Sequence, residues 1–113
     1  MANVECPPVA VTCGDPSGVG PEVAVKAWRT LGNSVPFFWI GDPRHLPSDT
    51  PIALLTDPAK ASEVHDGFPV IAHPFEAEAT PGQPAPMNAK GVVQVIERAV
   101  SLVLDGQASA VCT

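Results

Sequence analysis

The sequence predicts an α/β fold with three layers and a mostly parallel sheet. Three observations point to this fold: an apolar strand at 9–12 leads through a glycine-rich turn into a helix, a second apolar strand at 37–40 follows, and a long helix precedes the last apolar segment. A strand, a crossover helix and a second strand make the two strands parallel, and place the loop after each strand on one edge of the sheet.

The first helix, predicted over 21–31, begins after a turn rich in glycine and proline. Gly20 suits the N-cap, and Pro21 suits the first helical position because its missing N–H needs no partner there. Glu22 adds a negative charge at the positive end of the helix dipole, and Gly32 with Asn33 ends the helix. Apolar residues recur every four positions and form one stripe that can cover a sheet. The stripe consists of Val23, Ala27 and Leu31, with Ala24 and Trp28 beside them.

The middle of the chain, from 43 to 86, holds most of the fourteen prolines and is predicted to be rich in loops. Short strands are expected at 52–55 and 70–72, and the proline-rich stretch 74–86 is expected to be a loop or an extended arm. The triplet Gly-Asp-Pro occurs at the ends of two predicted strands, at 14–16 and 41–43. We interpret the two triplets as equivalent turns.

The second helix is predicted to have Asn88 as its N-cap, Asp105 at its end and Gly106 in a left-handed conformation. One narrow stripe of it is polar: Lys90, Gln94, Glu97, Arg98, Ser101 and Asp105. Almost everything else is apolar: Val92, Val93, Val95, Ile96, Ala99, Val100, Leu102, Val103 and Leu104. Because one small domain cannot cover a helix on three sides, we expect this helix to pack on residues beyond Thr113 or on another chain.

Length and charge exclude several classes of protein. The 113 residues fit a single domain, and a formal charge of −6 with only six Lys and Arg argues against a nucleic-acid partner. No apolar run approaches the ~20 residues that cross a bilayer, and no basic, apolar leader precedes the first strand. The three cysteines are odd in number and lack metal-ligand spacing. A cytoplasmic protein with reduced thiols, no membrane partner and no disulfide framework is expected.

The glycine-rich turn is the candidate functional segment. A phosphate-binding loop of the Walker type is excluded because no Lys-Ser or Lys-Thr follows its last glycine, and a dinucleotide fingerprint would need a third glycine. Backbone N–H groups and the helix N-terminus can still face an anion or a polar ligand. Contacts are therefore expected from Gly14, Asp15, Ser17 and Gly18. The alternative is purely structural, with Asp15 closing an Asx turn and the glycines serving tight packing.

The string Gly-Asp-Pro-Ser-Gly-Val-Gly-Pro-Glu at 14–22 resembles the N-terminal signature of the 4-hydroxythreonine-4-phosphate dehydrogenase family. Ser17 and Val19 replace the usual Ala and Ile, and the final helix, the turn at Gly106 and the segment 110–113 resemble the family's next helix and strand. The resemblance implies that residues 1–113 are the N-terminal part of an α/β dehydrogenase domain, about a third of the family's length. It also implies an architecture like that of isocitrate and isopropylmalate dehydrogenases.

The resemblance further implies an oxidoreductase that uses NAD or NADP and a divalent metal (Zn, Mg or Co) to oxidise and decarboxylate 4-phosphohydroxy-L-threonine in pyridoxal 5'-phosphate biosynthesis. The family forms homodimers and holds its metal with three histidines that lie beyond this sequence. No catalytic or metal-binding residue is therefore expected in these residues, which alone should be inactive, although Thr113 is expected to border the cleft. The three histidines present, His45, His65 and His73, are expected to be solvent-exposed or to cap loops.

Two alternatives to this function remain open at the level of sequence. Relatives within the family act on other phosphorylated hydroxy acids, such as threonate or erythronate 4-phosphate, or on cis-diols. A different class of function is a shortened, non-catalytic interaction module.

Overall fold

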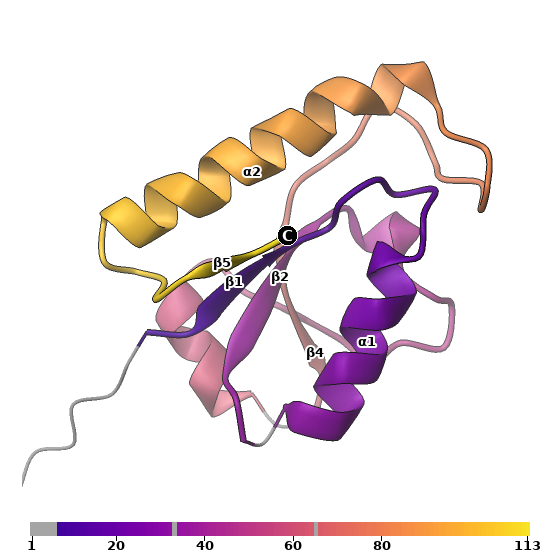
Figure 1. The fold of residues 1–113 in the computed structure, drawn as a ribbon. Coiled ribbons are helices and arrows are strands. Elements are labelled where there is room, and N and C mark those ends of the chain that lie inside the picture. The colour runs from indigo at the N-terminus through magenta and orange to yellow at the C-terminus, as the bar shows by residue number, and fades with distance from the viewer. Residues whose placement is uncertain (1–6, 33, 65) are drawn as a thin grey trace, which may run out of the picture.

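The structure is a computed structural model that describes residues 7–32, 34–64 and 66–113. Five parallel strands form one sheet in the order β3-β4-β2-β1-β5 (Figure 1). The two long helices lie on opposite faces of this sheet, so the predicted three-layer α/β fold is confirmed. The elements are β1 (Val9–Thr12), α1 (Gly20–Leu31), β2 (Phe37–Gly41), β3 (Ile52–Leu54), β4 (Phe68–Ala72), α2 (Ala89–Leu104) and β5 (Val111–Cys112).

Neither helix begins with a side-chain cap. α1 starts one residue early, so Val19 is its N-cap and Gly20 its first residue, with no capping side chain. A single turn of 3-10 helix, Pro86–Asn88, leads into α2. Asn88 is at the N-cap position, but its side chain makes no capping bond and instead holds a distant loop. The positions of the helices are therefore right, while the reason given for Asn88 is wrong.

The glycines that follow the two helices differ in backbone conformation. Gly106 has a φ of +77°, the left-handed conformation that glycine adopts without strain, as predicted. Gly32 instead stays right-handed at φ −56°, and its N–H donates to the Trp28 carbonyl at 2.8 Å. A Cβ at Gly32 would lie 2.6 Å from that carbonyl oxygen, so close approach explains the glycine. Asn33 lies outside the described residues.

The middle of the chain is more ordered than its prolines suggest. Two further 3-10 segments, Pro43–His45 and Pro58–Glu63, were not predicted, and each follows an Asp that accepts a bond from the backbone two residues on. β4 begins at Phe68, two residues earlier than predicted. Pro69 has no N–H to donate, yet the strand runs through it because the Phe68 N–H bonds the Pro51 carbonyl at 2.7 Å.

The core lies against the centre of the sheet. Every residue of β2 is buried, as expected for a strand covered on both faces. Trp28 of α1 packs edge-on against Phe68 with 5.8 Å between ring centroids, and Phe68 lies 5.9 Å from Trp39 of β2. Along the ranges that the structure describes, neither helix combines the length and the apolar character that crossing a bilayer requires.

α2 leaves much of its apolar surface uncovered, as the periodicity predicts. Its buried residues are Gly91, Val95 and Ala99. Val93 is 55% exposed and Leu104 is 82% exposed. What covers these side chains stays a prediction.

Candidate functional site

The glycine-rich turn connects the end of β1 to α1 and is closed by its own side chain. Asp15 Oδ1 accepts a hydrogen bond from the Ser17 N–H at 2.9 Å, and the Asp15 carbonyl accepts one from the Gly18 N–H at 3.0 Å. Gly14 lies in the left-handed region at φ +62°. A Cβ at Gly20 would lie 2.6 Å from the Cys13 carbonyl oxygen. The Asx turn and the packing role of the glycines are therefore both present.

Ser17 connects this turn to the loop between β4 and α2. Its side chain is buried, and its hydroxyl donates to the Gln83 carbonyl at 3.0 Å. In return the Gly82 N–H donates to the Ser17 carbonyl at 2.8 Å. We call residues 73–88 the strap, because they cross the carboxyl ends of the strands from β4 to α2. The tip of the strap is thus held by the turn after β1, and we call these two bonds the Ser17 clamp.

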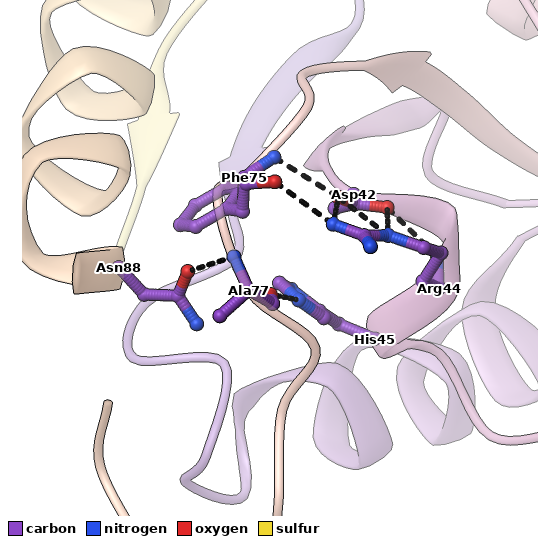
Figure 2. Close-up of polar contacts among 6 residues, drawn as sticks. All are labelled: Asp42, Arg44, His45, Phe75, Ala77 and Asn88. Carbon is purple, nitrogen blue, oxygen red and sulfur yellow. Dashed lines mark hydrogen bonds and ion pairs between the residues drawn. The ribbon is translucent and has the colours of Figure 1, made fainter. Parts of the chain in front are cut away.

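A second set of bonds, which we call the Asp42 clamp, holds the start of the strap at the end of β2 (Figure 2). Asp42 is 4% exposed, and its Oδ2 accepts bonds from Arg44 Nη2 at 2.9 Å and from the Phe75 N–H at 3.0 Å. Arg44 Nη2 also donates to the Phe75 carbonyl at 2.8 Å. Both backbone polar groups of Phe75 are therefore satisfied by one ion pair.

Electrostatics keep this clamp ionised. Burial alone would raise the pKa of Asp42, but the hydrogen bonds from the Arg44 side chain and from the Phe75 and Arg44 backbone lower its pKa to about 2. The hydrogen bond to Asp42 raises the pKa of Arg44 in turn. The pair is therefore charged at neutral pH.

Two further side chains hold the strap at Ala77 (Figure 2). His45 Nε2 donates to the Ala77 carbonyl at 2.9 Å, and Asn88 Oδ1 accepts from the Ala77 N–H at 3.0 Å. His45 is buried rather than solvent-exposed, and its bond to the strap carbonyl is the second of the two expected roles, the capping of a loop. Its ring lies edge-on to Phe75, with 5.1 Å between centroids. The strap is thus fixed at two successive points by residues from β2's end and from α2's start.

The four predicted contact residues occupy different environments. Asp15 and Gly18 are exposed, Gly14 is half-buried and Ser17 is buried. Gly18 lines a hollow of about 260 Å³ between the turn and the strap, together with Arg44 and Pro81. The structure brings the turn and the β2 end together at one edge of the sheet, where the side chain of Asp15 and the backbone of Gly14 and Gly18 can face outward.

The groups nearest the turn include a thiol and two hydroxyls. Burial raises the pKa of Cys13 to about 11, so it stays a neutral thiol and is no nucleophile at neutral pH. Thr12 Oγ1 donates to Thr113 Oγ1 at 2.7 Å, which joins the ends of β1 and β5. Thr113 therefore lies at the same edge as the turn.

A metal site is not formed by the part of the chain that the structure describes. There, no three His, Cys, Asp or Glu side chains gather closely enough to hold an ion. His73 Nε2 lies 3.2 Å from Gln94 Oε1 and its Nδ1 lies 3.3 Å from Arg98 Nη1. His65 lies outside the described residues.

Sequence reasoning did not single out Asp42 and Arg44, although a signal for them existed. The repeated Gly-Asp-Pro triplet predicts equivalent turns, and in both the Asp Oδ1 accepts a bond from the N–H two residues on. Only the second triplet is followed by an arginine, and that arginine supplies the long-range bonds to the strap.

Comparisons with known proteins agree on one group of relatives, although no protein-family model matches the chain. The chain is 48% identical over 107 residues to 4-hydroxythreonine-4-phosphate dehydrogenase of Roseobacter denitrificans, a match that covers 94% of this chain and 33% of the relative. The same enzyme of Paracoccus denitrificans is 50% identical over 110 residues, 96% of this chain and 33% of that one. The chain thus spans about a third of the length of these curated relatives.

Solved structures agree with the sequence matches. The crystal structure of 4-hydroxythreonine-4-phosphate dehydrogenase from Klebsiella pneumoniae superposes with a TM-score of 0.81 at 26% identity, over 93% of this chain and 36% of that one. The Burkholderia phymatum enzyme gives a TM-score of 0.73 at 27% identity, over 96% of this chain and 36% of that chain. In sequence and in fold, the chain is therefore similar to the N-terminal third of 4-hydroxythreonine-4-phosphate dehydrogenases.

Proposed function

We propose that this chain supplies the N-terminal part of a dehydrogenase domain that oxidises, and then decarboxylates, 4-phosphohydroxy-L-threonine in pyridoxal 5'-phosphate biosynthesis. The observation that carries the proposal is the 48% identity to a named dehydrogenase over 94% of this chain. Identity at this level extends well beyond the glycine-rich turn, so the proposal does not depend on one short motif.

The proposed reaction uses NAD or NADP and a divalent metal such as Zn, Mg or Co, and the described residues do not fit either group. No cluster of metal ligands is present among them, and the glycine-rich turn carries an exposed carboxylate, Asp15, where a pyrophosphate would approach. We therefore assign no step of the chemistry to these residues. The metal, the nicotinamide site and the homodimer contacts would come from the two thirds of the relatives' length that this chain does not span.

The role proposed for this chain is to form one wall of the substrate cleft. Ligands of open α/β sheets bind outside the carboxyl ends of the strands, which is where the turn, the Asp42 clamp and Thr113 lie. The two clamps fix the strap and the turn relative to each other, so the backbone at Gly14 and Gly18 and the side chain of Asp15 would meet a ligand with little reorganisation. Ser17 would act through its bond to Gln83.

A chimera tests this proposal directly. In the chimera, residues 1–113 of this chain replace the matched third of the Roseobacter denitrificans relative. Reduction of NAD or NADP is then measured with 4-phosphohydroxy-L-threonine as the substrate, in the presence of Zn, Mg or Co in turn. We expect turnover by the chimera and none by the 113-residue chain alone. The unmodified relative is the control.

Three results would contradict the proposal or part of it. A chimera that folds but is inert, while the unmodified relative is active, would show that this chain cannot serve as the N-terminal part. Faster turnover of threonate or erythronate 4-phosphate or a cis-diol would favour the alternative substrates within the family. Reduction of NAD by the 113-residue chain alone would overturn the view that its chemistry lies elsewhere.

A further inference from the structure

An apolar groove of about 440 Å³ runs between α1 and the neighbouring edge of the sheet. Its floor is the face of β1 and β5 that α2 does not cover, and one of its walls is α1. The apolar lining includes Val9, Val11, Val23, Ala27 and Leu31, with Cys112 at the β5 side. Val23 is 57% exposed and Leu31 is 46% exposed, so the stripe that the sequence predicts to cover a sheet is not buried at these two residues.

The groove exists because α1 does not lie over the whole sheet. Trp28 of α1 packs against Phe68 of β4, which places the helix on the β2 and β4 side. β1 therefore alternates along its length: Ala10 and Thr12 are buried on the α2 side, whereas Val9 and Val11 are only half-buried on the α1 side. A parallel sheet is normally covered on both faces. On the α1 side, β1 and β5 lack the helix that would complete this cover.

The shape and chemistry of the groove fit one kind of occupant. α1 has 12 residues and is thus roughly 18 Å long, and helices pack side by side about 8 to 10 Å apart. A helix with an apolar face, laid beside α1 over β1 and β5, would cover the groove. The lining is apolar throughout, apart from Thr12 and Thr113 at one end.

We propose that this groove seats a helix from the part of the enzyme that the relatives carry beyond the matched third; this inference rests on the proposed function. The chain spans 33% of the Roseobacter relative and 36% of the Klebsiella structure, so about two thirds of each is available to supply it. Thr113, which follows β5, lines the groove, and the relatives extend beyond the residues that match this chain. The groove is thus where the two parts of the enzyme join.

Reactivity of Cys112 reports on this groove without any need for catalysis. Cys112 is exposed and pairs with Val11 on the groove face, whereas Cys13 is buried. Alkylation by iodoacetamide is followed at each cysteine by peptide mass spectrometry, in the 113-residue chain and in the chimera described above. A Thr56→Cys substitution in both proteins supplies a matched exposed thiol just after β3, at the opposite edge of the sheet.

We expect Cys112 to react at least tenfold more slowly in the chimera than in the 113-residue chain, while the thiol at position 56 reacts equally fast in both. Val23→Asp in the chimera should restore the reactivity of Cys112, because a charge in the groove displaces the helix. Val93→Asp, at an equally exposed valine of α2 outside the groove, should leave Cys112 protected.

Equal reactivity of Cys112 in both proteins would overturn the proposal. Protection of Cys112 in the 113-residue chain that grows with its concentration would also overturn it, since the occupant would then be a second copy. The outcome is separable from the proposed function: protected Cys112 in an inert chimera supports the groove and contradicts the activity, and reactive Cys112 in an active chimera does the reverse.

Discussion

Two pairs of strands differ in how completely this chain covers them: β2 with β4, which we call the covered half, and β1 with β5, which we call the uncovered half. The edge strand β3 belongs to neither pair, because Ile52 and Leu54 are exposed. β2 is buried at every residue and β4 at all but its last, whereas β1 is buried only at alternate residues and β5 is half-buried or exposed. On α1, Val23 belongs to the predicted apolar stripe and is 57% exposed, whereas Val25 lies outside that stripe and is 2% exposed. The comparison shows that apolar periodicity identifies which face of a helix seeks burial, but not whether this chain provides the cover.

The largest effect is expected in the covered half, at Asp42. Asp42→Asn removes the negative charge that receives five bonds from Arg44 and Phe75. The buried amide that results cannot accept all of these bonds. The substitution should therefore lower the free energy of unfolding by about 2 to 4 kcal/mol, measured by urea denaturation. Asp57→Asn is the matched control, because Asp57 closes a similar turn but is exposed. Equal losses from both variants would contradict the clamp.

The same clamp predicts how stability depends on pH. The folded pKa of Asp42 is lowered to about 2, whereas an unfolded Asp titrates near 3.9. Its stabilising contribution is therefore complete above pH 4 and is lost as the pH falls from about 4 towards 2. We expect the unfolding free energy of the Asp42→Asn variant to fall less steeply over this range than that of the natural sequence.

A pair of valines on α1 tests the difference between the halves. Val25→Ala should cost about 2 kcal/mol, since Val25 is 2% exposed and the substitution leaves a cavity. Val23→Ala should change the unfolding free energy of the 113-residue chain by less than about 0.5 kcal/mol. In the chimera the cost of Val23→Ala should approach that of Val25→Ala. If Val23→Ala already causes a large loss of unfolding free energy in the 113-residue chain, the groove is covered there, which would contradict this difference.

A smaller effect than that of Asp42→Asn or Val25→Ala is expected at Ser17, where the turn after β1 holds the strap. Ser17→Ala removes one hydrogen bond to the Gln83 carbonyl and should cost about 1 kcal/mol. Proteolysis in the strap should increase modestly in this variant and more strongly in Asp42→Asn. The reverse order would place the main anchor of the strap at the β1 turn.

Local patterns in the sequence predict the helices and strands, but they do not predict which distant segments these elements contact. The apolar runs predict four of the strands, and the spacing of apolar residues predicts both helices, because these signals lie within one turn or one strand. The fifth strand is expected from the family resemblance of segment 110–113. β4 begins two residues earlier than predicted, and Pro69 does not interrupt it, because the Phe68 N–H still bonds the Pro51 carbonyl.

The candidate site shows the same limit more strongly. The Asx turn at Asp15 could be predicted, because its partner is two residues away. The bonds from Asp42 and Arg44 to Phe75 span more than 30 residues, and those of His45 to Ala77 span 32, so no local pattern contains them. For this reason the sequence leaves two roles open for His45, solvent exposure or loop capping, and gives no partner for it. A buried acid and a buried histidine in proline-rich surroundings become predictable only when the strap is known to cross the strand ends.

Hydrogen exchange in the two proteins tests the central claim most directly. Amide protection is compared for β2 and β4 on one side and for β1 and β5 on the other, in the 113-residue chain and in the chimera. We predict that β2 and β4 hold similar protection in both, while β1 and β5 gain at least tenfold only in the chimera. Equal protection of β1 and β5 in the two proteins would contradict the view that the remaining two thirds of a dehydrogenase complete this half of the sheet.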